Sequence, residues 1–297
     1  MKFEDDLNDK DVQDQWRRLQ AAIEKKQAAG EQPVRAIRPG WKTSWKTGWK
    51  RSAGIAASLA LLLAVSIWLI HEPSSRILYS TGYGEQKHIT LPDSSRVVLN
   101  SNSSLSFDNN WQPQEPRSVE LSGEAFFSVV HTGNNQRFIV NTPEGMEVQV
   151  LGTEFNVYDR RGIQRVVLNS GSVRLEYKDR EAVSMAPGEM VTRQGQGARL
   201  EKRKVDASRY SSWTSGRLVF ENTPVKEICR LIQDNFGLAV SLPDTLLGNR
   251  LFNGTFPAND AEVLLKALMT TYNLEVAENG GGLQLRRKPV PPGNQGR

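Results

Sequence analysis

The sequence is poor in the residues that build disulfide, metal and catalytic sites. It contains one cysteine and three histidines in 297 residues. A single cysteine excludes a disulfide within the chain, and the place of Cys229 in an apolar helical pattern predicts a small core residue rather than a reactive thiol. His71, His88 and His131 do not have the spacing of zinc ligands, and no phosphate-binding loop, dinucleotide fingerprint or nucleophile elbow occurs. We therefore expect no enzyme, no cofactor and no metal.

Long hydrophobic runs are also scarce, with one exception at Ala53–Ile70. This segment carries no charge and would rise about 27 Å as a helix, close to the hydrocarbon thickness of about 30 Å in a bilayer. The rival interpretation is a cleaved signal peptide, but about fifty residues precede the run and no A-x-A cleavage site follows it. The sequence therefore predicts one transmembrane helix at residues 53–70.

The flanks of this run predict its orientation. Six basic residues and no acidic residue lie between positions 35 and 51, whereas His71 and Glu72 follow the run. Positive residues favour the cytoplasmic side, so the N-terminus is predicted to be cytoplasmic. The membrane anchor should comprise Trp41, Trp45, Trp49, Lys50, Arg51 and Trp68, although the tryptophan stripe could instead bind a specific lipid or protein. The same basic cluster explains the net charge of +5 without nucleic-acid binding.

The cytoplasmic head, residues 1–52, contains one convincing helical pattern between Asp9 and Ala29. Four apolar residues on one face are spaced by four, three and four positions: Val12, Trp16, Leu19 and Ile23. So short a head cannot build much of a core around this stripe. We expect a protein partner in the cytoplasm to cover it, with self-association, the membrane surface or a marginal helix without a specific contact as alternatives.

The next region, residues 71–200, changes to a period of two. Apolar residues alternate with polar ones around Val119, at 146–150 and at 173–177, and turn signals separate these runs at short intervals. Glycines at 123, 152 and 171 are expected at strand ends, in turns or bulges. The pattern predicts an all-β periplasmic domain that forms a twisted sandwich, a roll or a solenoid-like sheet.

The last region, residues 210–288, mixes both periods and partly repeats. A strand at 218–220, a helix at Val225–Phe236 and a strand at 238–240 are followed by a second round of strand, helix and strand. The second helix should start at Asp260 and bury an apolar face made by Val263, Leu264, Ala267 and Leu268. We predict a small α+β domain of two βαβ-like units, followed by a disordered Pro- and Gly-rich tail at 289–297.

Several strings of the β-rich region resemble the periplasmic domain of FecR-family anti-sigma regulators, in order and in spacing. They are ITLPD at 89–93, VELSGEAFF at 119–127, FIV at 138–140, VLGTEFNV at 150–157, GSV at 171–173 and PGE at 187–189. GRLVFENTP at 216–224 and the repeat after it resemble the C-terminal domain of Bacteroidetes-type members, which is similar to the secretin and TonB N-terminal fold. The resemblance covers roughly Tyr79 to Arg286.

The resemblance implies a signalling relay across the bacterial inner membrane. In this family a TonB-dependent outer-membrane transducer presents a periplasmic signalling domain to the C-terminal part of the regulator, and the cytoplasmic head controls an extracytoplasmic-function sigma factor. In many members, stepwise cleavage by site proteases ends within the membrane helix and releases the head. The sigma-binding face here would be Val12, Trp16, Leu19 and Ile23.

Two departures from the family pattern stand out. Only VQDQWRRL at 12–19 resembles the cytoplasmic region of the family, which is usually longer. The short match argues against inhibition by full wrapping around a sigma factor, and the alternatives are weak binding, promotion of sigma activity or a truncated start of the head. In addition, Ser94 stands where the family commonly has glycine in an L-P-D-G-S turn, which a type I turn can tolerate.

Transducer contact is expected at an exposed strand edge of the α+β domain, by strand addition. The candidate residues are Leu218, Val219, Phe220, Leu274 and Val276. The alternative function is a membrane-tethered periplasmic module that binds glycan or protein without sigma control, for which the candidate aromatic residues are Trp111, Phe126, Phe127 and Trp213. A periplasmic hydrolase would require a polar cleft with converging acids.

Overall fold

A computed structural model describes residues 76–177, 180–195, 197–279 and 282–288 of the chain. The predicted head helix, the tryptophan and lysine anchor with Trp68, the span at 53–70 and the tail at 289–297 lie outside these residues. Within the described residues, no helix has both the length and the apolar character needed to cross a membrane.

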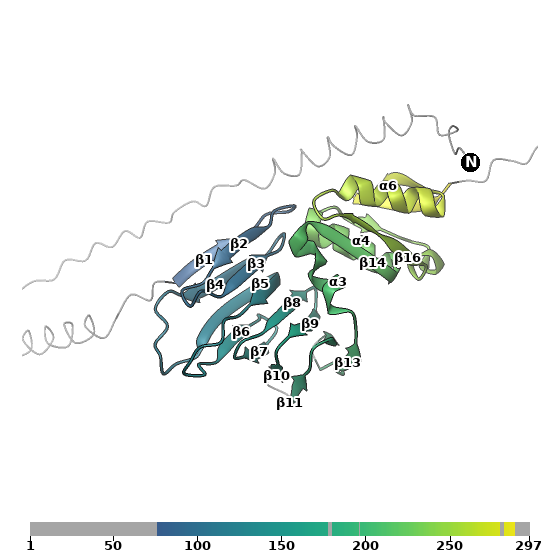
Figure 1. The fold of residues 1–297 in the computed structure, drawn as a ribbon. Coiled ribbons are helices and arrows are strands. Elements are labelled where there is room, and N and C mark those ends of the chain that lie inside the picture. The colour runs from purple at the N-terminus through teal and green to yellow at the C-terminus, as the bar shows by residue number, and fades with distance from the viewer. Residues whose placement is uncertain (1–75, 178–179, 196, 280–281, 289–297) are drawn as a thin grey trace, which may run out of the picture. The chain divides into compact units, whose positions relative to one another are not determined.

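The first thirteen strands form one continuous, curled sheet that mixes parallel and antiparallel pairs (Figure 1). The main order is β11-β10-β7-β6-β5-β8-β9-β12-β13, while β4 and β3 also pair with β5 and carry β1 and β2 respectively. The strands are β1 (Arg76–Ser80), β2 (Lys87–Thr90), β3 (Arg96–Leu99), β4 (Ser104–Asp108), β5 (Arg117–Ser128), β6 (Phe138–Asn141), β7 (Met146–Val150), β8 (Glu154–Arg160), β9 (Ile163–Ser170), β10 (Val173–Tyr177), β11 (Arg180–Met185), β12 (Glu189–Gln194) and β13 (Glu201–Lys204). We call this region the β domain.

Strand β5 explains why the sheet curls instead of separating into two stacked sheets. Its first half pairs with β4 and β6, and its second half, from Gly123, pairs with β3 and β8. Gly123 has φ +106, and a Cβ built there would lie 2.8 Å from the Ser103 Cα, so only glycine fits this bend. The predicted β-rich class is confirmed, but Gly123 lies inside a strand rather than at a strand end.

The period-two pattern matches the burial of the β domain. Met146, Val148 and Val150 are buried on β7 while the residues between them are half-buried, and β5 and β10 show the same alternation. Strands β4, β6, β8, β9 and β12 instead bury consecutive residues, and therefore side chains on both faces of the sheet. The core inside the curled sheet is mainly aliphatic and includes aromatic side chains, among them the stacked rings of Phe127 and Phe155, whose centroids are 5.1 Å apart.

The C-terminal domain, residues 207–288, adds helices to two small sheets (Figure 1). Its elements are α3 (Ala207–Ser211), the 3₁₀ turn η1 (Ser212–Ser215), β14 (Arg217–Pro224), α4 (Val225–Phe236), β15 (Val240–Ser241), α5 (Thr245–Gly248), β16 (Leu251–Pro257), α6 (Ala261–Tyr272), β17 (Leu274–Asn279) and β18 (Gly282–Arg287). The predicted bounds of α4 are confirmed.

The strand pairing of this domain corrects the predicted βαβ-like units. Strand β14 pairs antiparallel with β16, and β15 belongs to a separate sheet of order β15-β18-β17. The two strands that flank each helix therefore lie in different sheets, whereas a βαβ unit places them parallel in one sheet. Sequence order indicated the elements, but their pairing depends on contacts between the two repeats.

The helix ends follow the predicted repeat. Gly237 ends α4 with φ 69 and Asn273 ends α6 with φ 52, so both helices stop at a left-handed residue. Asp260 caps α6 by accepting from the Val263 N–H at 3.0 Å. The predicted α6 face is wrong by one residue, because Val263 is exposed and Leu265 is buried beside Leu264 and Leu268.

Candidate functional site

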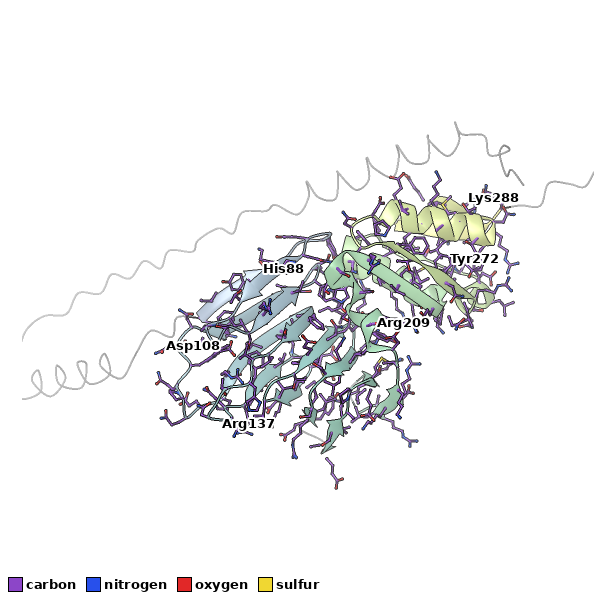
Figure 2. All side chains as sticks on the ribbon, viewed as in Figure 1. His88, Asp108, Arg137, Arg209, Tyr272 and Lys288 are labelled. Carbon is purple, nitrogen blue, oxygen red and sulfur yellow. The ribbon has the colours of Figure 1, made fainter. Side chains whose placement is uncertain are left out.

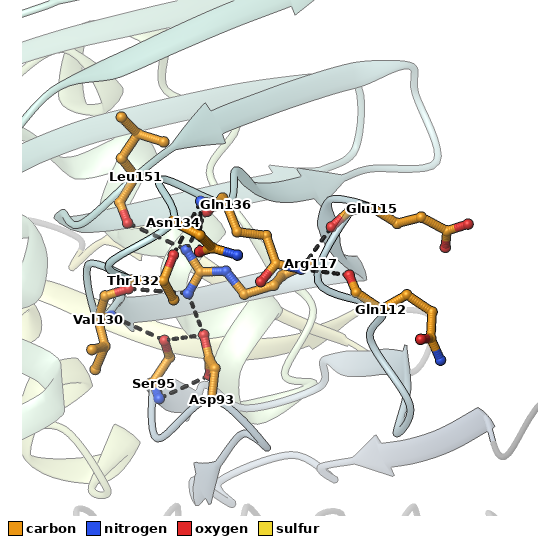
Figure 3. A network of polar contacts seen from close by, with 10 residues as sticks. All are labelled: Asp93, Ser95, Gln112, Glu115, Arg117, Val130, Thr132, Asn134, Gln136 and Leu151. Carbon is orange, nitrogen blue, oxygen red and sulfur yellow. Dashed lines mark hydrogen bonds and ion pairs between the residues drawn. The ribbon is translucent and has the colours of Figure 1, made fainter.

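A buried arginine ties together three loops of the β domain (Figure 3). Arg117 is 1% exposed and forms an ion pair with Asp93. Its guanidinium also donates to the carbonyls of Val130 at 3.0 Å, Gln136 at 2.7 Å and Leu151 at 3.3 Å. The guanidinium group is buried and bonded to groups of the protein itself. We therefore interpret the network as a structural clamp that holds the loops together, and not as a binding site.

The turn that carries Asp93 belongs to the same clamp. The Ser94 N–H donates to the Leu91 carbonyl at 2.9 Å, and the Ser95 hydroxyl donates to the Asp93 carboxylate at 2.7 Å. Ser94 has φ 68, the left-handed region, which explains why glycine suits this position. The type I turn expected here is therefore followed by a strained residue.

The more promising site lies where the β domain meets the C-terminal end of α4. Asp234 is only 4% exposed, yet both of its carboxylate oxygens have partners on the β domain. The Tyr158 hydroxyl donates to one oxygen at 2.6 Å, and Arg161 Nε donates to the other at 2.6 Å. Burial, followed by the neighbouring Asp234 charge, raises the pKa of Tyr158 well above its ordinary value, so the phenol stays a donor.

Backbone groups at the end of α4 are also bonded by the β domain. Arg160, 8% exposed, donates to the Asp234 carbonyl at 2.7 Å, and the Gly84 N–H donates to the Asn235 carbonyl at 2.8 Å. A cation at a helix C-terminus complements the helix dipole. Tyr83 lies so close to Gly237 that a Cβ there would approach its ring to 2.9 Å. The last turn of α4 is therefore held against the β domain by hydrogen bonds and close packing.

A ladder of aromatic rings and guanidinium groups continues from Tyr158 to the connecting helix α3. Arg165 lies over Tyr158 at 5.4 Å and over Tyr210 at 5.6 Å, and Arg209 lies over Tyr210 at 5.9 Å. Arg209, labelled in Figure 2, also donates to the Glu221 carbonyl of β14 at 2.9 Å. The ladder thus joins β8, β9, α3 and β14.

These groups surround a cleft of about 150 Å³ between the two domains. Its walls combine the carboxylates of Glu124, Glu227 and Asp234, the guanidinium groups of Arg165, Arg209 and Arg230, the rings of Tyr158, Tyr210 and Trp213, and the β14 residues Leu218, Val219, Phe220 and Thr223. Glu124 accepts from Asn100 at 2.7 Å and Asn156 at 2.9 Å, and Asp234 is bonded as described. These two acids are held as hydrogen-bond acceptors, which suits recognition better than proton transfer.

Strand β14 presents its edge to the cleft. Successive side chains of a strand point to opposite faces of its sheet. Leu218, Val219 and Phe220 follow one another along β14 and all line the cleft, so the cleft runs along the edge of this strand. Among the described strands, β14 pairs with β16 alone. Its other edge is met by the Arg209 side chain at Glu221.

The five predicted transducer-contact residues fall on two strands in different sheets. Leu218 and Phe220 are each 5% exposed, Leu274 is fully buried, and Val219 and Val276 are half-buried. Strand β17, which carries Leu274 and Val276, is an edge strand of its sheet but does not line the cleft. The structure therefore places three of the five, Leu218, Val219 and Phe220, beside the cleft.

The aromatic residues considered for glycan binding are buried or half-buried. Phe127 is fully buried and Trp213 is 4% exposed. Trp111 packs against the rings of Phe107 at 5.7 Å and Phe138 at 6.0 Å, and Phe126 is half-buried. They do not form the exposed flat platform that stacking on sugars requires.

The remaining candidates from the sequence are the cysteine, the histidines and the sigma-binding face. Cys229 is buried in α4, as predicted, and burial raises the pKa of its thiol to about 11. His88 and His131 are exposed, and His88 is labelled in Figure 2. In the described part of the chain, no three His, Cys, Asp or Glu side chains gather as metal ligands would. The sigma-binding face Val12, Trp16, Leu19 and Ile23 lies outside the described residues.

Sequence reasoning missed the residues that join the two domains. Tyr158, Arg160, Arg161 and Asp234 were not singled out, and neither was Arg117. One local signal was present: Tyr158-Asp159-Arg160-Arg161 places three charged residues in succession at the end of a strand. Their partner is 73 to 76 residues away, and no periodic pattern predicts such a contact.

Comparison with known proteins agrees with this architecture. The sequence profile described as FecR protein matches residues 77–174, and the profile described as FecR, C-terminal, matches residues 217–283. Two crystal structures of a candidate anti-sigma factor from Parabacteroides distasonis, at 2.50 and 1.65 Å resolution, have the same fold, each with a TM-score of 0.62 and 24% identity. Each match covers 72% of this chain and 100% of the other. No curated protein matches the sequence. With both profiles in their expected places, the chain belongs to the FecR family and contains the FecR C-terminal domain.

Proposed function

We propose that the protein is an anti-sigma factor that relays a periplasmic signal through the inner membrane to an extracytoplasmic-function sigma factor. Membership of the FecR family, with both profiles matched in order, is the observation that carries this proposal. The protein is proposed to cross the membrane once at 53–70, with its N-terminus in the cytoplasm, and to act by binding rather than by catalysis.

The receiving element is proposed to be the edge of β14. An edge strand can pair with an extended segment of another protein through backbone hydrogen bonds. The signalling domain of a TonB-dependent outer-membrane receptor is the proposed partner. The position of β14 beside the cleft, with charged groups of both signs on its walls, supports this choice over β17.

Capture of the sigma factor by the full-length, detergent-solubilised protein tests the cytoplasmic half. Trp16→Ala and Leu19→Ala remove large apolar side chains from the predicted face, so we expect capture to fall at least about tenfold, since buried interface anchors are worth about 2 kcal/mol or more. Arg17→Ala, away from that face on the predicted helix, is the matched control. Equal capture by all variants would show that the face is wrongly assigned.

Capture of candidate receptor signalling domains tests the periplasmic half. Leu218 and Phe220 are buried, so changing them would damage the domain, whereas Val219 is half-buried at the cleft. Val219→Arg should block an added strand and weaken capture, while Val276→Arg on β17 should leave it intact. A loss confined to Val276→Arg would move the docking edge to β17.

A further inference from the structure

The contacts of Asp234 with Tyr158, Arg160 and Arg161 lie beside the cleft that leads to the proposed docking edge of β14. Tyr158 and Asp234 both line the cleft, and so do the β14 residues whose edge faces it. The group that joins the two domains therefore also forms a wall of the cleft. Whatever separates Tyr158 from Asp234 must also change the width of the cleft.

The chemistry of this junction is polar. Its best-defined contacts are an ion pair, a hydroxyl–carboxylate bond and bonds to two backbone carbonyls of α4. Polar interfaces between domains of one chain resemble transient protein–protein interfaces and commonly permit relative motion. The apolar cores lie on either side of the junction, in the curled sheet and around Ile228 and Leu268. Opening the junction would thus leave both cores assembled and would expose more of the apolar side chains that line the cleft, Trp213, Leu218 and Phe220.

We infer that Asp234, Tyr158, Arg160 and Arg161 form a latch that holds the C-terminal domain against the β domain and limits access to the β14 edge. Opening the latch releases the last turn of α4 from the β domain and widens the cleft along β14. This inference rests on the proposed docking at the β14 edge and states how that docking is regulated. A docked partner and the closed latch would compete for the same space.

Hydrogen–deuterium exchange of the full-length protein tests the latch in the absence of any partner. Tyr158→Phe removes only the hydroxyl, and Asp234→Asn removes only the charge. The matched controls lie within the C-terminal domain: Tyr272→Phe removes a hydroxyl that donates to the Leu251 carbonyl at 3.0 Å, and Glu275→Gln breaks the 2.6 Å ion pair with Arg286.

We expect both latch variants to accelerate exchange at the amides of β14 and of residues 82–86 by about tenfold or more, and the controls to leave these amides unchanged. Exchange within α6, β17 and β18 should stay as in the parent protein. Unchanged exchange at β14 would overturn the inference. Equal acceleration throughout α6, β17 and β18 would also overturn it, because Asp234 would then support the domain itself. Since no receptor is present, these outcomes are independent of whether docking occurs at β14.

Discussion

The β domain and the C-terminal domain differ in the share of their strands that lies at a sheet edge. In the β domain, thirteen strands share one curled sheet, a single apolar core lies inside it, and Arg117 fixes the loops at one end. In the C-terminal domain, the strands are divided between a two-stranded and a three-stranded sheet, so four of the five described strands, β14, β15, β16 and β17, keep an edge without a strand partner, against four of thirteen in the β domain, β1, β2, β11 and β13. The first arrangement gives rigidity, and the second leaves backbone groups available for a partner.

The contrast also separates two uses of buried charge. Arg117 and Asp93 are both buried within one domain, where the pair holds loops of a single core. Asp234 is buried but its partner Arg161 is 49% exposed, and the two belong to different domains. A pair inside a core can be lost only by unfolding, whereas a pair at a domain junction can open while both cores persist.

The largest expected effect comes from removing the buried guanidinium of the β domain. Arg117→Met leaves the buried Asp93 carboxylate without its counter-charge and takes the guanidinium donor away from three carbonyls, so the free energy of unfolding should fall by about 3–5 kcal/mol. Urea denaturation of the full-length protein measures it. Arg76→Met, which breaks an ion pair with Glu120 in which both side chains are more than half exposed, should cost no more than about 1 kcal/mol. Similar losses in the two variants would contradict the role given to burial.

Truncating an aromatic core residue of the C-terminal domain should lower the free energy of unfolding by a similar amount, but only in that domain. Phe220 packs against Phe252 at 6.1 Å and Phe256 at 6.0 Å, and Phe220→Ala should destabilise that domain by about 3 kcal/mol. Hydrogen exchange should rise in β16 and α6 and stay unchanged in β5 and β8. If β5 and β8 lose protection as well, the two domains form one cooperative unit and the comparison fails.

Tyr158→Phe should cost less, about 1.5–3 kcal/mol, because it removes one hydrogen bond to a carboxylate. The effect should depend on pH in a defined direction. Burial and Asp234 raise the pKa of Tyr158 in the folded protein, whereas in the unfolded chain the phenol titrates near pH 10. The unfolded state therefore loses its proton first as the pH rises.

The stabilisation from Tyr158 is consequently complete below about pH 10 and is lost as the pH rises further toward the folded-state pKa. Urea denaturation of the parent and Tyr158→Phe proteins between pH 7 and 11 gives the difference directly. The gap should be constant up to about pH 9 and narrow above pH 10. A gap that widens with alkaline pH would mean that the phenol is not a buried donor.

The smallest expected effect concerns the strained turn of the β domain. Ser94 has φ 68, so Ser94→Gly should relieve the backbone and raise the free energy of unfolding by up to about 1 kcal/mol, partly offset by the greater freedom of glycine when unfolded. Thermal denaturation measures the change. A lower stability for the glycine variant would show that the serine contributes more than strain.

Local pattern was sufficient to predict the kinds of elements in both domains. The period of two gave the strands of the β domain, and the apolar spacing at 225–236 gave α4 with its buried Cys229. Such patterns reflect which side of an element avoids water, and that preference is written in neighbouring residues. The strings shared with the FecR family added the class of protein.

The sequence by itself therefore determined the helices and strands, most of their buried faces and the family. Only the tertiary structure decided which other segments those faces contact. The pairing of β14 with β16 instead of β15, the bend at Gly123, the burial of Arg117 and the contact of Tyr158 with Asp234 all join segments far apart in the chain. Periodicity carries no information on such partners, because a half-buried polar residue looks the same in sequence whether it faces water or another domain. The latch and the cleft arise only when the chain closes on itself.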